Sequence, residues 1–194
     1  MNIEQQKQIA KNVYDKLRLA DPDCLLAGGA PRDWYFGETC NDLDFYFCST
    51  ACTMGSTQRQ LKAIGFENVK HIADPYSSEL YKSMEGLLRI WECEYEGMKV
   101  QFIQLCTPQN RWKVVDNMDI SICKAYCKQS DLSIVLHRDF KLTVASRVMF
   151  LKEGYDWEQK HAVKMFERFK GKFAAGTKEQ ATDRLIRVSL EGIQ

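Results

Sequence analysis

The sequence predicts an α+β protein in which helices cover one face of a mixed or antiparallel sheet and a small C-terminal helical bundle follows. Short apolar runs typical of strands alternate with helical patterns up to residue 138. Two segments of alternating polarity flank Gly97 and predict a β-hairpin. From residue 139 onward the apolar spacing is helical. We therefore expect an α/β core over residues 1–138 and a helical subdomain over residues 139–194.

Composition and charge limit the possible functions. The 194 residues are enough to bury a core, and 45% hydrophobic with 27% charged residues is typical of a globular protein. Lys+Arg 27 and Asp+Glu 26 give a formal charge of +1, which excludes binding to nucleic acid through overall charge. Any site for a polyanion must be local.

The sequence has no signal core at its N-terminus and no apolar run of the roughly 20 residues that cross a bilayer. We therefore expect a cytoplasmic protein without a membrane partner. The eight cysteines are scattered, so we expect reduced, buried thiols instead of disulfides. The spacing of Cys48 with Cys52, and of Cys123 with Cys127, is not that of a zinc site.

A helix, a strand and a glycine turn precede the most informative segment. Apolar residues at four-residue spacing predict an amphipathic helix within Ile3–Leu19, and Cys24–Ala27 predicts a buried strand. Gly28 and Gly29 allow positive φ and a close backbone approach at the end of that strand. A short helix over Pro31–Phe36 follows, and helix starts attract phosphate. Glycine pairs also occur in ordinary turns, so this pair alone does not identify a site.

Two aspartates alternate along the next predicted strand. Side chains two residues apart point to the same face, so Asp42 and Asp44 project together while Leu43 and Phe45 face the other side. Neighbouring carboxylates repel each other unless a cation lies between them. Mg²⁺ is commonly held by one or two carboxylates with substrate phosphates, so the pair fits a nucleotide–metal site. A solvated strand edge at a turn is the alternative.

The glycine pair and the aspartate pair together form one compound motif. Its members are Gly28, Gly29, Arg32, Asp33, Asp42, Leu43, Asp44 and Phe45. In order and spacing this motif resembles the signature of the DNA polymerase beta-type nucleotidyltransferase superfamily. Within it, the motif is most similar to the head domain of CCA-adding enzymes and bacterial poly(A) polymerases, and to small stand-alone phage and bacterial relatives.

The resemblance implies a nucleotidyltransferase-like sheet, an NTP substrate such as ATP, and catalytic Mg²⁺ or Mn²⁺ ions bound by Asp42 and Asp44. It also implies that the glycine pair cradles the triphosphate, and that Arg32 and Asp33 fix the motif or the nucleotide. In that scheme one metal activates an attacking hydroxyl and the other supports the leaving pyrophosphate.

A third carboxylate is expected, by the same resemblance, on a central strand of the form hydrophobic-Asp-hydrophobic. The best match places Gln101 where the acid would stand, and an amide is a poorer Mg²⁺ ligand than a carboxylate. Asp119 begins another alternating segment and would complete the site if that strand paired beside Asp42 and Asp44. The alternative for Asp119 is an acid that satisfies a turn amide.

Between these segments we expect a polar loop over Ser49–Ser56, a helix from Thr57 to Ile64 and a strand over Val69–Ile72. The residues from 74 to 78 are turn-rich and predict a rim over the site. The hairpin over Leu87–Leu105 places the glutamates at 92, 94 and 96 on one face, which we expect to be solvated.

The C-terminal part predicts a strand over Leu132–Leu136 and a helix from residue 140 to residue 151 with Asp139 as its N-cap. Further helices are predicted over Tyr155–Lys172 and from residue 177 to residue 190. The lysines and the arginine of the helix over Tyr155–Lys172 could contact RNA. The alternative is that they form a solvated face of this helix. His137 has either a structural role or a substrate contact.

Two functions remain open. The first is a minimal nucleotidyltransferase that moves a nucleoside monophosphate from an NTP to a hydroxyl on RNA, a small molecule or a protein. The second is a catalytically degenerate nucleotidyltransferase fold that acts as a nucleotide-, RNA- or protein-binding regulatory module, as Gln101 suggests. CCA-adding enzymes usually continue into a longer helical tRNA-binding region, so we expect a role other than unaided tRNA 3′-end repair.

Overall fold

The computed structural model describes residues 1–48, 53–75, 86–107, 111–158 and 160–191. The strands are β1 (Leu25–Ala27), β2 (Asp42–Cys48), β3 (Lys70–Ala73), β4 (Leu87–Tyr95), β5 (Met98–Leu105), β6 (Ala125–Cys127), β7 (Ile134–Leu136), β8 (Val148–Phe150) and β9 (Ala174–Gly176). The helices are α1 (Ile3–Leu17), α2 (Gly29–Tyr35), α3 (Met54–Ala63), α4 (Arg111–Asp116), α5 (Arg138–Ser146), α6 (Lys160–Phe169) and α7 (Lys178–Glu191).

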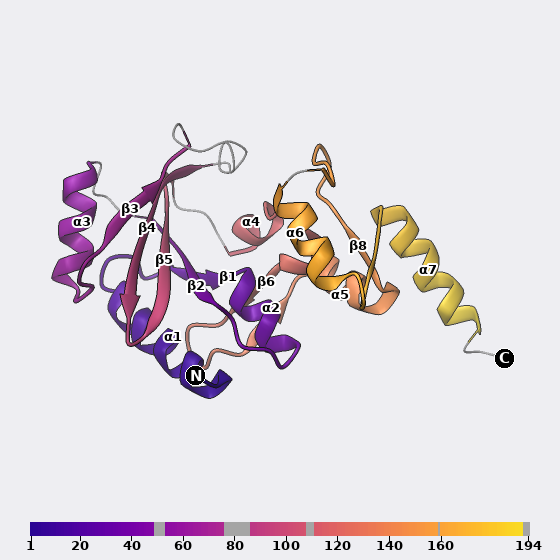
Figure 1. The fold of residues 1–194 in the computed structure, drawn as a ribbon, viewed down its shortest axis with the longest axis horizontal. Helices are drawn as coiled ribbons and strands as arrows, with labels where there is room; N and C mark the ends of the chain where they lie inside the picture. The colour runs from indigo at the N-terminus through magenta and orange to yellow at the C-terminus, as the bar shows by residue number, and fades with distance from the viewer. Residues whose placement is uncertain (49–52, 76–85, 108–110, 159, 192–194) are drawn as a thin grey trace.

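Within the described residues one large sheet has the strand order β3-β4-β5-β2-β1-β6-β7. β2 and β5 run parallel, and the other neighbouring strands are antiparallel. The mixed sheet and the helices around it confirm the predicted α+β class (Figure 1).

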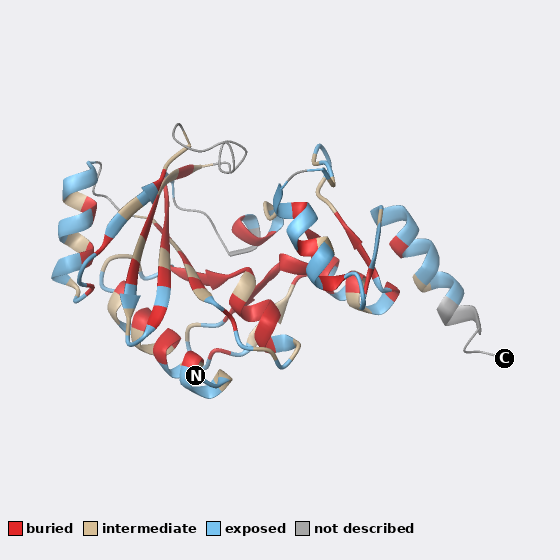
Figure 2. Cartoon of the chain, viewed as in Figure 1, coloured by how far each residue is buried: buried red, intermediate tan, exposed pale blue. Residues whose placement is uncertain are grey.

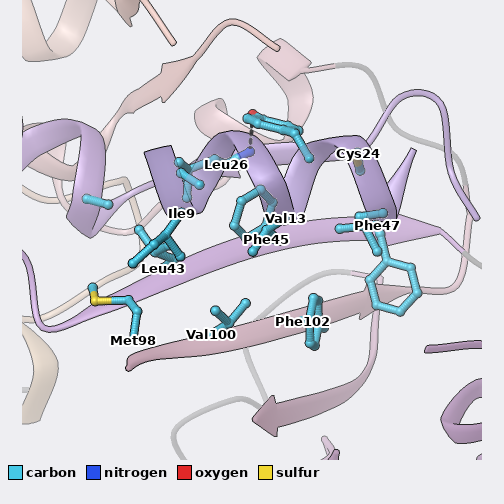
Figure 3. Close-up of a cluster of buried hydrophobic side chains, with 14 of the residues drawn as sticks. Ile9, Val13, Cys24, Leu26, Leu43, Phe45, Phe47, Met98, Val100 and Phe102 are labelled. Atoms are coloured by element: carbon cyan, nitrogen blue, oxygen red, sulfur yellow. Dashed lines mark hydrogen bonds between the residues drawn. The ribbon is translucent and has the colours of Figure 1, made fainter. Parts of the chain in front are cut away.

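One face of the sheet packs against α1 and α3. Asn2 caps α1, since its side chain accepts from the Gln5 amide at 2.9 Å and the Gln5 side chain accepts in return. The apolar stripe of α1, including Ile9 and Val13, joins the inward residues of β1, β2 and β5 in one buried cluster (Figure 3). Leu43 is fully buried in this cluster, so the odd-numbered residues of β2 fix which way its even-numbered residues point.

The opposite face has its own apolar cluster near the far end of β2. There Leu25 of β1 and Ile103 of β5 pack with Val115 of α4. The start of β2, with Asp42 and Asp44, is on this face but outside the cluster. The sheet therefore presents polar side chains at one end of a face whose other end is covered.

The C-terminal helices lie at one end of the elongated molecule, with α7 and its exposed residues farthest from α3 (Figures 1 and 2). A buried cluster joins Phe140, Met165 and Phe169 of this part to Ile122 and Ala125. Apolar contacts thus cross the position where the sequence suggests a division, near residue 138.

The predicted helix from residue 140 to residue 151 is wrong in its second half. α5 ends at Ser146, its C-cap Arg147 has a left-handed backbone with φ 56°, and β8 follows. β8 pairs in parallel with β9, which the helical pattern did not predict. The N-cap is also different, because the His137 side chain accepts from the Asp139 amide at 3.1 Å. His137 is buried and its Nε2 lies 2.7 Å from Asp116, so its described contacts are structural.

Three smaller predictions need adjustment. Helix α3 begins earlier than expected, because Thr53 and not Thr57 is its N-cap. The rest of the predicted loop, residues 49–52, and most of the predicted rim, residues 76–78, lie outside the described residues. The segment after Asp119 is a single bridge at Ile120 and a 3₁₀ turn, with β6 starting only at Ala125.

The seven described cysteines form no disulfide with one another. Five of them are buried as expected, whereas Cys48 is half-buried and Cys106 is exposed. None of the helices in the described ranges combines the length and apolarity that spanning a bilayer requires.

Candidate functional site

The predicted pair Asp42 and Asp44 projects together from β2, as the alternation of the strand requires. Both are half-buried, whereas Leu43 and Phe45 on the other face are fully buried. Because the apolar residues hold the strand in this register, the two carboxylates cannot turn into the core without exposing the core residues.

A row of polar side chains continues from this pair across two more strands. In register, Asp44 lies beside Gln101 of β5, and Gln101 lies beside Glu92 of β4. The Gln101 amide donates to Glu92 Oε2 at 2.9 Å. Lys99 Nζ lies 3.0 Å from Asp42 Oδ2 and 3.8 Å from Glu92 Oε2. Carboxylates of β2 and β4 therefore share one ammonium.

The glycine turn lies directly beside this row. Gly28 has φ +85°, a conformation that side-chain-bearing residues rarely adopt, and its amide donates to Ala125 at 2.9 Å. A Cβ built on Gly29 would lie 3.7 Å from an Arg32 guanidinium nitrogen and 4.0 Å from Asp44 Oδ2. The turn, the guanidinium and the carboxylate of the compound motif thus lie close together.

Arg32 and Asp33 are both buried and bind each other, with Arg32 Nε donating to Asp33 Oδ1 at 2.8 Å. From α6, Arg168 lies 3.1 Å from Asp33 and 3.2 Å from Glu38. Lys172 adds a second contact to Glu38 at 2.9 Å. The described contacts of Arg32 and Asp33 therefore fasten α2 to α6, and their contact with a nucleotide stays a prediction.

Asp119 does not lie on a strand beside the aspartate pair. The strand that follows it, β6, pairs with β1 and β7 instead of β2. Asp119 Oδ2 instead lies 2.8 Å from His161 Nδ1 of α6. The imidazolium form of His161 opposes the rise in the pKa of Asp44. Asp119 is thus connected to the site through His161, and its catalytic role stays a prediction.

The electrostatics of Asp44 set it apart from the surrounding acids. Burial raises its pKa to about 7, the Asp42 carboxylate adds to the rise, and Lys99, Arg32 and His161 oppose it. Among the described residues Asp44 makes no hydrogen bond or ion pair. A cation bound here would supply the positively charged partner that the Asp44 carboxylate does not find among the described side chains.

The residue types fit a hard divalent cation that is bound jointly with phosphate. Asp42 and Asp44 offer the oxygen ligands that Mg²⁺ prefers, and the Lys99 ammonium shows that positive charge is favourable against Asp42. No three His, Cys, Asp or Glu side chains in the described ranges are grouped to hold an ion by themselves. An ion here would therefore need ligands from a substrate as well.

Sequence reasoning missed Glu92, Lys99 and His161. The first two were accessible in principle, because a two-residue turn at 96–97 fixes the hairpin register and places Glu92 opposite Gln101. His161 comes from a helix whose position depends on the packing of the C-terminal part. No local signal in the sequence reports that position.

The model of the family described as "Gad2: Gabija anti-defense 2 family protein" matches residues 3–147. This chain belongs to the Gabija anti-defense 2 family. The matched residues contain the compound motif, the hairpin and Asp119, and they end before α6. No similar sequence was found among curated proteins.

Solved structures show which fold this family member has. A structure described as a tRNA-processing enzyme in its apo form I has a TM-score of 0.60 at 13% identity, covering 97% of this chain and 48% of that one. The Bacillus stearothermophilus CCA-adding enzyme in complex with CTP has a TM-score of 0.55 at 15% identity, and the match covers 90% of this chain and 42% of that one. The Thermotoga maritima CCA-adding enzyme complexed with tRNA has a TM-score of 0.52 at 13% identity, and the match covers 87% of this chain and 38% of that one.

At these identities the likeness shows a nucleotidyltransferase-like fold alone. The chain spans less than half the length of these structures.

Proposed function

We propose that this Gabija anti-defense 2 family member is a nucleotidyltransferase that moves a nucleoside monophosphate from an NTP to a hydroxyl group. The observation that carries the proposal is the convergence of the glycine turn with the aspartate pair, in which the Gly29 backbone lies beside Asp44 Oδ2. A triphosphate held against the turn would have its oxygens close to both carboxylates. That is the arrangement in which a protein and a nucleotide share a divalent cation.

The residues of the chain then have separate tasks. Gly28 gives the turn its shape, and Gly29 would bring a phosphate close to Arg32 and Asp44. Asp42 and Asp44 would hold Mg²⁺ or Mn²⁺, which when bound polarises phosphoryl oxygens and lowers the pKa of an attacking hydroxyl. Asp119 would act through His161, 2.8 Å away. The protein contributes position and charge.

The acceptor is RNA, a small molecule or a protein. The family description names opposition to Gabija defence, which favours an acceptor or partner that belongs to that defence. The solved structures of similar fold include complexes with CTP and with tRNA, which are compatible with nucleotide and RNA partners.

Labelling tests the proposal. The purified protein is incubated with Mg²⁺ or Mn²⁺ and each of four α-³²P-labelled NTPs, with RNA, lysate protein and small-molecule fractions as acceptors. We expect label from at least one NTP to appear on one acceptor class and to disappear with Asp42→Ala. If no acceptor is labelled by any NTP, transferase activity is excluded under these conditions.

A second function is favoured by one specific feature. Gln101 occupies the strand position next to Asp44, where an acid would complete a carboxylate set on β2 and β5. The alternative is therefore a degenerate fold that binds nucleotide, RNA or protein as a regulatory module without releasing pyrophosphate. In that case Asp42→Ala would leave the anti-defence activity intact.

A further inference from the structure

The contacts between α6 and α2 follow the two helices in opposite directions. Late in α6, Arg168 lies 3.2 Å from Glu38, which comes after the end of α2. Three residues earlier, Met165 Sδ accepts from an Arg32 guanidinium nitrogen at 3.2 Å, and Arg32 is in the middle of α2. The contacts therefore move toward Gly29, the first residue of α2, as α6 is followed toward its own start.

His161 lies one helical turn before Met165. Residues four apart share a face of a helix and are about 6 Å apart along its axis. His161 is therefore on the face of α6 that contacts α2, displaced toward the glycine turn. Its electrostatic effect agrees with this position: burial raises the pKa of Asp44, and the charged His161 ring is among the groups that oppose this rise. His161 thus lies near the point where the glycine turn meets the aspartate pair.

The segment that contains Asp119 approaches the same point. Met118 Cε would lie 3.6 Å from a Cβ built on Gly28, so the residue before Asp119 packs against the glycine turn. The Lys152 amide donates to the Asp119 carbonyl at 2.7 Å. The backbone at Asp119 is therefore fixed beside the turn.

Asp119 holds the His161 ring in one orientation, with Oδ2 2.8 Å from Nδ1. Because a carboxylate only accepts, this contact places a proton on Nδ1, and in the charged ring Nε2 is a second donor. The His161 side chain is 46% exposed, and its Nε2 has no hydrogen-bond partner among the residues that the structure describes. An oriented donor that is open to solvent beside the glycine turn is suited to an anion.

We propose that His161, oriented by Asp119, binds a phosphate group of the NTP beside the glycine turn. The inference rests on the proposed nucleotidyltransferase function and assigns the substrate contact that α6 makes. Nε2–H of the charged ring donates to a phosphate oxygen, and the Asp119 carboxylate stabilises that charge through Nδ1. Asp119 is then a positioning residue that does not itself touch the substrate.

Nuclear magnetic resonance of the histidine rings tests the contact directly. The chain has three histidines, so protein labelled with ¹⁵N-histidine gives few ring signals, and the variants His161→Asn and His71→Asn assign them by loss. Inorganic tripolyphosphate with Mg²⁺ is the probe, because it presents the phosphate chain without a base. We expect the His161 signals to shift and the His71 signals to stay. Unmoved His161 signals at saturating tripolyphosphate overturn the inference.

Calorimetric titration with the same probe measures what the contact contributes. Asparagine can keep the donor to Asp119 but has no group at the position of Nε2, so we expect His161→Asn to weaken tripolyphosphate binding by about 10-fold or more. His71→Asn is the matched control, because His71 also lies near an aspartate, 3.7 Å from Asp74, but on β3. Affinity in His161→Asn equal to that of the wild type and of the control contradicts the contact.

The part played by Asp119 is measured in two backgrounds. We expect Asp119→Asn to weaken tripolyphosphate binding by about 3-fold or more in the wild type and to cause no further loss in His161→Asn, since Asp119 acts through the histidine. The same loss in both backgrounds would show that Asp119 does not act through His161.

Asp42→Asn separates this inference from the proposed function. If Asp42→Asn weakens tripolyphosphate binding in Mg²⁺ and His161→Asn does not, the metal–nucleotide site stands and only the contact from α6 is wrong. No binding of tripolyphosphate by the wild type overturns the inference, and the proposed function fails with it only if labelling from the four NTPs also fails.

Discussion

The start of β2 and the contact between α2 and α6 both concentrate charged side chains, but they leave these charges in different states. At α2–α6, Asp33 is buried between Arg32 and Arg168, and Glu38 is shared by Arg168 and Lys172. At the start of β2, Asp44 has no direct partner among the described residues and its pKa rises to about 7, mainly through burial. Paired charges fasten two elements together, whereas an acid left without a partner is available to a ligand.

The largest expected effect comes from breaking the paired region. Asp33→Ala leaves Arg32 buried without its carboxylate, and removing one partner of a buried pair costs about 3–5 kcal/mol. Urea unfolding measures the loss of unfolding free energy. Glu38→Gln, at a half-exposed carboxylate, is the control and should cost less than about 1 kcal/mol. A similar small loss for both variants would show that the buried pair does not fasten α2 to α6.

The start of β2 should respond in the opposite way. Asp42→Asn removes one of two like charges together with a partly exposed ion pair to Lys99, so we expect the unfolding free energy to stay within about 1 kcal/mol of the wild type. Transfer of label should fall by about 100-fold or more, because a metal ligand is lost. An Asp42→Asn variant that unfolds easily and keeps its specific activity would reverse the assignment of the two regions.

Within the glycine turn, we expect substitution of Gly28 to reduce stability and substitution of Gly29 to leave it unchanged or slightly higher. Gly28→Ala places a Cβ on a backbone with φ +85°, and strain of this kind costs about 1–3 kcal/mol. Gly29→Ala meets its neighbours at ordinary contact distances of 3.7 and 4.0 Å, so it should be neutral or slightly stabilising. Thermal unfolding of both variants checks the difference. Equal losses would mean that the turn does not depend on the conformation of Gly28.

The smallest effect is a pH dependence in the C-terminal part. Burial by itself would raise the pKa of Asp139, but contacts from Lys178 and Lys124, each at 2.9 Å, outweigh it and lower the pKa. A lowered pKa stabilises the fold above the pKa of the unfolded state, and this contribution is lost as the pH falls through the folded value. Asp139→Asn should therefore make the unfolding free energy less dependent on pH in the acid range. An unchanged acid profile, measured by urea unfolding at several pH values, would exclude a role for these contacts.

The sequence predicted the features that depend on local periodicity. Alternation along β2 fixed the direction of Asp42 and Asp44, and the turn before Met98 fixed the hairpin. The amphipathic pattern of α1 was equally clear, because one face of a helix on a sheet must be apolar. These elements form the sheet that carries the site.

The rest depends on contacts between distant segments. The helical spacing of apolar residues after Phe140 did not reveal that α5 ends before Arg147. The next residues form β8, which is stabilised by pairing with the distant strand β9, and Arg147 adopts a left-handed conformation between α5 and β8. Asp119 would have lain beside Asp42 and Asp44 only if the strand after it paired with β2. That strand, β6, pairs with β1 instead, and no local sequence pattern specifies this choice. Glu92 looked like one solvated glutamate among several until its contacts with Lys99 and Gln101 distinguished it.

Calorimetric titration of the four NTPs in Mg²⁺ and in EDTA is the most direct test of the claim that Asp42 and Asp44 form a metal–nucleotide site. We predict that at least one NTP binds in Mg²⁺, and that EDTA or the Asp42→Asn/Asp44→Asn variant weakens this binding by about 10-fold or more. Binding that is equally strong in Mg²⁺, in EDTA and in the double variant, or no binding of any NTP, would contradict it.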